Sequence, residues 1–541
     1  MATAHFTAAP LTTAQSTTVP FATAGATADR AKAAVQRHGY GAGAYRPLGR
    51  TGLTVSAVGF GGYRVDDETP GHREALEQAL AMGVTLIDTS SNYGDGGSER
   101  LIGKVFAQQP ALREGTVIVS KAGYVQGQNM ELALQAQRRG EPFPEMVQYH
   151  PQCWHCIHPR FLADQLRLSL ERLALPALDV YLLHNPEYFF SDWVQRTPKG
   201  DLNTARDTFY RRCTDAFAEL ERQAGQGKLG GYGVSSNTFG ASAEASEFVS
   251  LERIVEAARR AARQVHGGDP RLAVVQCPLN LFESAPALEP NQSGGRTFLE
   301  LARAEGLGVL VNRPLNAIRN QRLIRLADRP PPRPDHAEQT VQALRDLEGL
   351  ETDFAQRFRP SVADRLPGSA GPHEPFDWAP QFRTVLPHLE SVEGWQQVLQ
   401  QVYPRIQHAL TEAAQALDGT MALGQLERWT QAYAMALQNL SRAIHEHVAQ
   451  AEHERATALR EKLTALEPAA WRALTLSEMA LRTVATVPGV TCVLNGMRRP
   501  EYVRDSLGAL AGAPLDGAEG LTVLKGWDPH PSLRSGQAPR A

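Results

Sequence analysis

Four polar residues that end or follow apolar runs have the chemistry of a carbonyl-reducing site. Asp88 and Tyr93 stand five positions apart in "GVTLIDTSSNYGDGGSER". Lys121 lies in "TVIVSKAG" and His184 in "LDVYLLHNPE". Each run is short, rich in Val, Ile and Leu, and stopped by polar residues, which is typical of a buried parallel strand. In an eight-stranded α/β barrel catalytic groups lie at the carboxyl ends of the strands, so these side chains are expected to meet there.

Each of the four residues has a different expected role in the reduction of a carbonyl group. Hydride reduction of a ketone or aldehyde needs a proton for the developing alkoxide, and Tyr93 is the predicted donor. A free phenol has a pKa of about 10, which a nearby ammonium lowers. Lys121 is expected to tune the phenol in this way, and Asp88 to hold the lysine charged and aimed. The imidazole of His184 is expected to donate to the carbonyl oxygen and orient the substrate.

Further segments follow these motifs in a fixed order, and together they resemble the aldo-keto reductase family. "YRPLGRTGLTVSAVGFGGYR" is similar to the opening hairpin and first strand of that family. "SLERLALPALDVYLLHNPE" is similar to its third helix and fourth strand. The resemblance implies an NAD(P)H-dependent oxidoreductase that reduces an aldehyde or ketone to an alcohol, or catalyses the reverse reaction. Tyr93 is then the general acid/base.

The resemblance also implies where the cofactor binds. Ser235 and Ser236 in "QGKLGGYGVSSNTF" and Gln276 in "AVVQCPLNLFE" are expected at the nicotinamide amide. The chain departs from the family pattern after the seventh strand, where an aromatic residue often stacks on the nicotinamide. It departs again near the 2′-phosphate, where the family often has a lysine-serine pair. At these places the implied cofactor residues are Asn312, Arg313, Gly496, Arg498, Arg499, Tyr502 and Asp505.

Because the planar fork of arginine suits phosphate, Arg498 and Arg499 favour NADP(H) over NAD(H). No G-x-G-x-x-G stands between a strand and a helix, so a Rossmann site is not predicted.

Alternating strand and helix signals predict an α/β (β/α)8 TIM barrel with a large helical insertion between strands 7 and 8. Helices are expected near 72–82, 98–107, 159–174, 208–227, 250–265 and 297–305. Seven strands precede residue 315, and the eighth follows only near residue 490. The expected parts are therefore a flexible N-terminal extension (1–44), strands 1–7 (45–316), the helical insertion (317–470), strand 8 with the last helix (471–515) and a C-terminal tail (516–541).

Bulk composition excludes several other classes of protein. The 541 residues carry a formal net charge of −3, with 21% charged residues, so no nucleic-acid partner is expected. No apolar run approaches the roughly 20 residues that span a bilayer, and no membrane association is expected. Five cysteines, an odd number in a large chain, predict no disulfide framework and favour a reducing, cytoplasmic location. The expected partner is a small-molecule carbonyl or alcohol.

The helical insertion keeps a second class of function open. Three roles are consistent with the insertion. It could cover the active site as a lid, bind another copy of the chain or a protein partner, or only stabilise the barrel. The alternative function is a nucleotide-sensing interaction protein on an aldo-keto reductase barrel, which binds its partner through the insertion. The complete set of four polar residues favours catalysis over this alternative.

A second insertion, after Lys121, carries histidines and cysteines close together in "YHPQCWHCIHP". Zinc binding, a redox pair and ordinary loop packing all fit the C-x-x-C of Cys153 and Cys156. A closed zinc site usually draws on a second pair, which the chain lacks, so no metal site is predicted. Aromatic residues in the loops after strands three and four suit either packing or substrate contact: Trp154, Tyr188, Phe189, Phe190 and Trp193.

Overall fold

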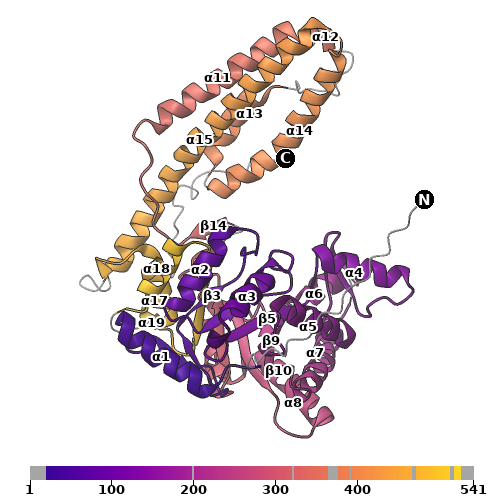
Figure 1. Cartoon of the computed structure of the whole chain (residues 1–541), viewed down its shortest axis with the longest axis vertical. Helices are drawn as coiled ribbons and strands as arrows, with labels where there is room; N and C mark the ends of the chain where they lie inside the picture. The colour runs from indigo at the N-terminus through magenta and orange to yellow at the C-terminus, as the bar shows by residue number, and fades with distance from the viewer. Residues whose placement is uncertain are drawn as a thin grey trace. The chain divides into compact units, whose positions relative to one another are not determined.

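The computed structural model describes residues 20–197, 200–319, 322–362, 376–389, 391–465, 471–511 and 517–524. Two compact units divide the chain at Leu326/Ala327 and at Ala465/Leu466 (Figure 1). Of the predicted terminal segments, residues 1–19 and 525–541 lie outside the described residues.

The first unit is a closed barrel of eight parallel strands, as predicted. The barrel closes where the last strand pairs with the first, with Val493 opposite Val58. The strand interiors are Val-, Leu- and Ile-rich and fully buried, as parallel strands covered on both faces require. In chain order the strands are β3 (Val58–Gly61), β4 (Leu86–Asp88), β5 (Val117–Ala122), β9 (Leu178–His184), β10 (Leu229–Ser235), β11 (Leu272–Pro278), β12 (Gly308–Asn312) and β15 (Cys492–Asn495).

Helices follow the strands and cover the outside of the barrel (Figure 1). The six helices predicted before residue 315 are confirmed. A capping box at Thr475 and Glu478 opens the helix that leads into the last strand. The covering helices are α2 (Pro70–Ala81), α3 (Gly97–Gln108), α5 (Pro159–Leu173), α7 (Leu202–Gly225), α8 (Leu251–Val265), α10 (Phe298–Ala304), α17 (Leu476–Ala485) and α18 (Pro500–Gly508).

The expectation of a flexible extension over 1–44 is wrong for the part that the structure describes. Helix α1 (Ala24–His38) begins at the N-cap Thr23 and buries Thr27, Ala31 and Ala34. Arg30 donates to the Leu80 carbonyl and to Thr116 Oγ1. An Ala- and Thr-rich segment has no large apolar stripe, but its small side chains let the helix pack closely. The hairpin β1 (Tyr45–Pro47) and β2 (Thr54–Ser56) follows.

The insertion after β5 forms a small sheet and helices on the loop side of the barrel. The sheet has the order β6-β8-β7 and is antiparallel. Its elements are β6 (Tyr124–Val125), α4 (Gly127–Arg138), β7 (Val147–His150) and β8 (Cys153–His155), and α6 (Tyr188–Arg196) follows β9. A small apolar cluster around Cys156 and Phe161 supports it.

The second unit, Ala327–Ala465, is helical and has its own apolar core, so the predicted helical insertion between strands 7 and 8 is confirmed. Stacked Trp429 and Tyr433 lie in this core. Buried Glu351 accepts hydrogen bonds from the first backbone N–H groups of α13 and from Tyr433. Its helices are α11 (His336–Arg357), α12 (Arg359–Val362), α13 (Trp378–Val385), α14 (Val392–Ala416) and α15 (Met421–Thr464).

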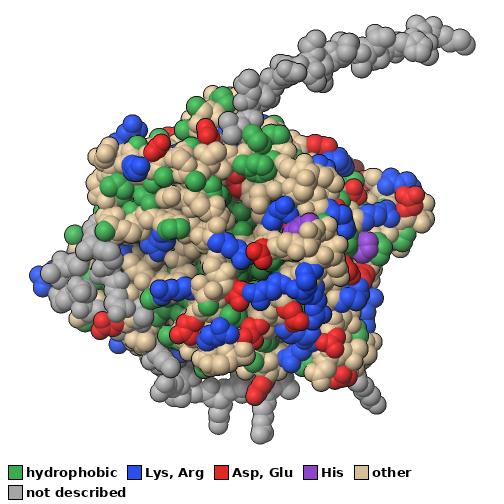
Figure 2. Space-filling model, turned by 90° about the horizontal axis from the view of Figure 1, so that it is seen from below, with side chains coloured by type: hydrophobic (Ala, Val, Ile, Leu, Met, Phe, Trp, Pro, Cys, Tyr) green, Lys and Arg blue, Asp and Glu red, His purple; other side chains and the backbone are tan. Residues whose placement is uncertain are grey.

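The hairpin β13 (Asn316–Arg319) and β14 (Arg322–Arg325) stays with the barrel unit, although the predicted insertion begins at residue 317. The Ile318 N–H donates to Glu283, which lies in the loop after β11. On the face that Figure 2 shows, basic side chains lie beside acidic ones. Among the described helices, none combines the length and apolar character needed to cross a membrane.

Candidate active site

The four predicted catalytic residues meet at the carboxyl-terminal rim of the barrel. Asp88 is the last residue of β4, and His184 is the last residue of β9. Lys121 lies near the end of β5, and Tyr93 lies in the loop between β4 and α3. Strands β4, β5 and β9 are neighbours in the barrel, which is why residues 96 positions apart in the sequence, from Asp88 to His184, converge.

Lys121 is the centre of the group. Its ammonium is fully buried and lies 2.6 Å from Asp88 Oδ2. It also donates to the Thr89 carbonyl at 2.9 Å and to the Tyr93 hydroxyl at 3.3 Å. A buried charge needs such partners, because the Coulombic attraction and hydrogen bonds must offset its desolvation. The same three contacts fix the ammonium beside the phenol.

His184 is held on several sides. Its Nδ1 lies 3.0 Å from Ser90 Oγ. Its ring meets the rings of Tyr93 and Tyr124 edge to face, with centroids 5.8 and 4.7 Å apart. Asn185, the next residue, donates its N–H to the Ser235 carbonyl and turns the chain with a positive φ of 53°. The imidazole is therefore fixed beside the Tyr93 phenol.

Burial controls the ionisation of these groups. It raises the pKa of Tyr93 well above its usual value, and the Asp88 carboxylate and Tyr63 raise it further. The predicted lowering of the Tyr93 pKa by Lys121, whose ammonium lies 3.3 Å from the hydroxyl, stays a prediction. Burial lowers the pKa of Lys121, while Asp88 opposes that shift. Burial, with Lys121 and His155, holds the pKa of His184 well below its usual value. At neutral pH the site thus presents a protonated phenol and a neutral imidazole.

Three predicted amide-binding residues form a connected group on the next strands. Gln276 Oε1 accepts from Ser235 Oγ at 3.1 Å and from Asn312 Nδ2 at 3.3 Å. Gln276 Nε2 donates to Asp88 Oδ1 at 2.8 Å, which connects the group to the predicted catalytic residues. Ser236 lies beside it and donates its backbone N–H to the Gln276 carbonyl.

Asn312 Oδ1 is buried without a hydrogen-bond partner. An orphan acceptor beside amide and hydroxyl groups fits a bound carboxamide, which has both an N–H₂ donor and a carbonyl acceptor. The residues present therefore fit the nicotinamide end of a dinucleotide.

The other predicted cofactor residues lie in two places. Arg313 follows β12 and makes an ion pair with Glu283 at 2.6 Å. Around the start of α18, Gly496, Arg499 and Tyr502 are exposed and Arg498 is partly buried.

Asp505 is the exception among these residues. It accepts hydrogen bonds from Thr475 and Ser477, which open α17, so its carboxylate already serves the contact between two helices.

The aromatic residues of the loops separate into two groups. Phe189 and Phe190 are buried against Phe209 of α7, and Trp193 packs on Phe189. These residues therefore pack the loop. Tyr188 instead meets Tyr124, whose hydroxyl donates to the Tyr188 hydroxyl and accepts from Asn185. Trp154 packs against the small cluster around Phe161.

Sequence reasoning missed the supporting residues Ser90, Tyr124 and Glu187. Each stands within three positions of a predicted catalytic residue, and this proximity is the signal that could have identified it. Glu187 is buried, its Oε1 accepts from the Asn237 N–H at 2.8 Å, and burial raises its pKa to about 7.

The histidines and cysteines after Lys121 do not share one centre. Cys156 is buried with its thiol near the Pro144 carbonyl, whereas His150 is exposed on β7. Among the described residues, no group of three or more His, Cys, Asp or Glu side chains could hold a metal ion.

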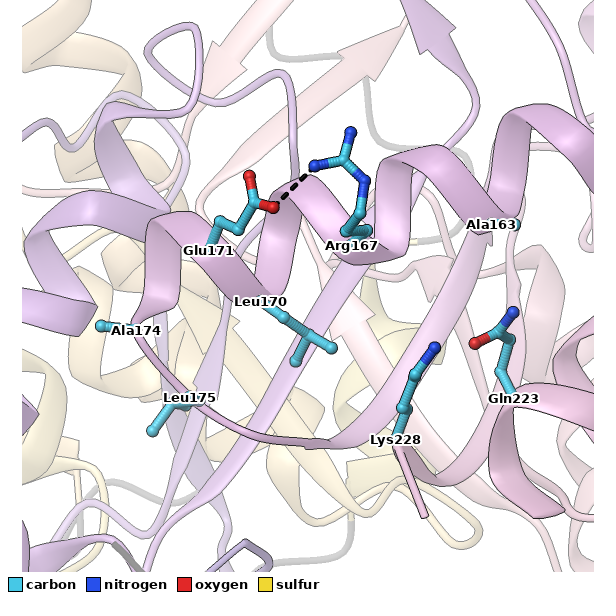
Figure 3. Close-up of a pocket in the computed structure, with 8 residues that line it drawn as sticks. All are labelled: Ala163, Arg167, Leu170, Glu171, Ala174, Leu175, Gln223 and Lys228. Atoms are coloured by element: carbon cyan, nitrogen blue, oxygen red, sulfur yellow. Dashed lines mark hydrogen bonds and ion pairs between the residues drawn. The ribbon is translucent and has the colours of Figure 1, made fainter. Parts of the chain in front are cut away.

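A pocket of about 350 Å³ lies away from the rim residues, against α5 and the end of α7 (Figure 3). The ion pair of Arg167 and Glu171 lies at its edge, and both side chains are 58% exposed. None of the predicted site residues lines it.

The parallel barrel and the four residues at its rim define the class of protein. The model of the Aldo/keto reductase family matches residues 57–352. This match covers more than half of the chain, which therefore belongs to the aldo/keto reductase family.

Curated relatives match parts of the chain. A 6-dehydroglucose reductase of Novosphingobium aromaticivorans is 28% identical over 153 residues, which cover 27% of this chain and 42% of the relative. An NADH-specific methylglyoxal reductase of Escherichia coli is 24% identical over 198 residues, or 35% of this chain and 51% of the relative. A D-threo-aldose 1-dehydrogenase of a Pseudomonas species is 27% identical over 220 residues, or 38% and 58%. The chain thus spans about half the length of these relatives.

Proposed function

We propose that the protein is an NAD(P)H-dependent oxidoreductase that reduces an aldehyde or ketone to an alcohol, or catalyses the reverse reaction. One observation carries the proposal: the buried Lys121 ammonium contacts both the Asp88 carboxylate and the Tyr93 hydroxyl. A phenol held by a buried ion pair beside a neutral imidazole can pass a proton to a carbonyl oxygen. Three relatives are named for their action on 6-dehydroglucose, methylglyoxal or an aldose. These names support a small carbonyl compound or sugar as the substrate of this protein.

In this mechanism the nicotinamide, when bound, supplies the hydride. The side chains of the site orient the substrate and donate the proton. His184 Nε2–H donates to the substrate oxygen and fixes its angle. This role needs the proton on Nε2. Nδ1 lies 3.0 Å from Ser90 Oγ, and that hydroxyl also lies 2.7 Å from Asn92 Oδ1. Tyr93 then transfers its hydroxyl proton to the oxygen as charge develops there. Lys121 stabilises the phenolate that remains, and Asp88 keeps the lysine in place.

Ser235, Gln276 and Asn312 would hold the carboxamide of the cofactor. Gln276 Oε1 accepts hydrogen bonds from the other two side chains and keeps the three together. Arg498 and Arg499 would bind the phosphate of the adenosine end. They stand directly before Pro500, the first residue of α18, where the helix dipole also favours negative charge.

We therefore propose a preference for NADP(H) over NAD(H). The double variant Arg498→Ala/Arg499→Ala is expected to weaken NADPH binding much more than NADH binding, measured by calorimetric titration. An unchanged ratio of the two dissociation constants would contradict this role.

A panel of aldehydes, ketones and alcohols with each nicotinamide cofactor tests the proposed function. Tyr93→Phe should reduce turnover by about 10²–10⁴-fold, the usual contribution of a general acid, and leave cofactor binding nearly normal. Tyr232→Phe is the matched control, because this tyrosine is also buried in the barrel but its hydroxyl bonds to Glu221. If the wild-type protein binds a nicotinamide cofactor and turns over no substrate of the panel, the alternative of a nucleotide-sensing interaction protein is favoured.

A further inference from the structure

The segment after Lys121 contains a histidine, His155, that is not among the four predicted catalytic residues. His155 is the last residue of β8, which pairs with β6 so that His155 stands opposite Tyr124. Strand β6 begins two residues after the end of β5, so this pairing returns the inserted segment to the barrel rim. His155 is 1% exposed there.

The ring of His155 contacts the main chain of His184. His155 Nε2 lies 2.7 Å from the carbonyl oxygen of His184, and both groups are buried. A carbonyl oxygen only accepts, so Nε2 carries the proton and donates it. Burial lowers the pKa of His155 to about 4, which keeps the ring neutral with its single proton on Nε2.

Two neighbouring residues, Gly123 and Tyr124, leave space for this hydrogen bond and pack around it. A Cβ atom at Gly123 would lie 2.4 Å from His155 Nε2 and 2.8 Å from the His184 carbonyl oxygen. Only a residue without a side chain leaves room for the contact. The ring of Tyr124 meets the rings of both histidines edge to face, with centroids 5.9 and 4.7 Å away.

His184 is the last residue of β9, and its carbonyl accepts the hydrogen bond from His155. Ser90 holds its ring, and the bond from Asn185 to Ser235 holds the following residue. His155 supplies the donor for the remaining group, the carbonyl. A catalytic ring displaced by about 1 Å can lose on the order of 10²-fold in rate.

We propose that His155 is a positioning residue for His184: its Nε2–H clamps the His184 carbonyl and sets the position of the catalytic imidazole. The inserted segment after β5 is thereby part of the catalytic support. This role rests on the proposed function, and it acts through His184 without contact to the substrate.

The kinetic test compares His155→Phe, His155→Gln and Gly123→Ala with the control His150→Phe, an exposed histidine of the same small sheet. We expect His155→Phe and Gly123→Ala to lower kcat by about 10–100-fold with an unchanged dissociation constant for NADPH. His155→Gln keeps an N–H donor at similar reach and should recover most of the loss. Wild-type kcat in folded His155→Phe would overturn the proposal. If that variant does not fold, Gly123→Ala decides in the same way.

A second readout does not depend on turnover. Histidine ¹⁵N spectra report the tautomer and environment of each ring, and a His184→Gln variant assigns the His184 signals. We expect one slowly exchanging Nε2–H from His155 and shifted His184 signals in His155→Phe. If the wild-type protein reduces no carbonyl, the proposed function fails. The spectra still test whether the hydrogen bond from His155 positions His184. Unchanged His184 signals in His155→Phe would overturn it.

Discussion

At the scale of single residues, burial at the rim shifts the pKa values of both Tyr93 and His184. The pKa of the phenol is raised and that of the imidazole is lowered. A proton donor benefits from the first shift, because the phenol stays protonated at neutral pH. A neutral hydrogen-bond donor benefits from the second.

These directions predict the pH dependence of the reaction. Because Tyr93 stays protonated and His184 stays neutral, kcat for reduction should be level from about pH 6.5 to about pH 9. Oxidation of the alcohol should rise over the same range, because the phenol must first lose its proton. Steady-state rates in both directions check this. A fall in the reduction rate centred near neutral pH would mean that one of the two pKa directions is wrong.

Glu187 gives a prediction for stability. Its pKa is raised to about 7 in the folded protein, against about 4.3 for a free side chain. A raised pKa favours folding when the group is protonated, and this advantage is lost as the pH rises through 7. The ionised carboxylate then costs about 4 kcal/mol, so Glu187→Gln should be more stable than wild type near pH 8.5, and the difference should be only about 1 kcal/mol near pH 5. Thermal unfolding at both values measures this, with exposed Glu244→Gln as the control.

The convergence of the candidate catalytic residues at one rim could be predicted because strand ends can be recognised from apolar runs that polar residues end. Asp88, Lys121 and His184 each lie within or beside such a run. His155 was visible only as part of a C-x-x-C cluster. Its contact with His184 depends on the antiparallel pairing of β6 with β8, which brings together residues 31 positions apart in the sequence, Tyr124 and His155. No local pattern encodes that register.

At the scale of elements, the N-terminal segment is joined to the barrel through one buried carboxylate. Asp179 of β9 accepts from the Ala22 N–H at 2.7 Å and from the Ile118 N–H of β5 at 2.7 Å. Arg113 completes this arrangement with a 2.9 Å ion pair and a hydrogen bond to the Pro20 carbonyl. The segment before α1 is therefore attached to two strands at once.

Arg113→Met tests this attachment. The ion pair is almost fully buried, so removing the cation leaves an unpaired carboxylate at a cost of about 3–5 kcal/mol. Arg167→Met is the matched control, because its partner Glu171 is exposed on α5 (Figure 3) and such pairs contribute about 0–1 kcal/mol. Denaturant unfolding measures both changes. Equal small losses would show that Asp179 is well satisfied by backbone N–H groups alone.

Helix α1 shows where sequence reasoning fails for elements. The apolar period predicted α2, α3 and α5, whose buried faces carry Leu, Ile or Phe. The buried face of α1 consists of Thr27, Ala31 and Ala34, which have weak hydrophobic contrast. Its stability comes from close packing and from the Arg30 hydrogen bonds, and both depend on distant residues.

At the scale of the whole molecule, a helical unit interrupts the barrel between β12 and β15. These two strands are neighbours that pair Leu310 with Cys492, so the chain leaves and re-enters the barrel at adjacent strands. Closure entropy grows only slowly with loop length, so such a site tolerates a long insert. The core of the helical unit contains Leu347, Trp395 and Trp429 and lies entirely within Ala327–Ala465. Each unit thus has the apolar core that independent folding requires.

This arrangement predicts that the two units fold separately. Replacing Ala327–Ala465 by a short Gly-Ser linker should leave a folded barrel that still binds NADPH, and the excised unit should be helical on its own. Calorimetry should show that each part retains one of the unfolding transitions of the intact chain. Michaelis constants for bulky carbonyls and the mass by light scattering then report the role of the insertion. A change in the Michaelis constants indicates control of substrate access, and a change in mass indicates an assembly surface. If both stay unchanged, the unit is a passive appendage, and a barrel that aggregates without it would contradict separate folding.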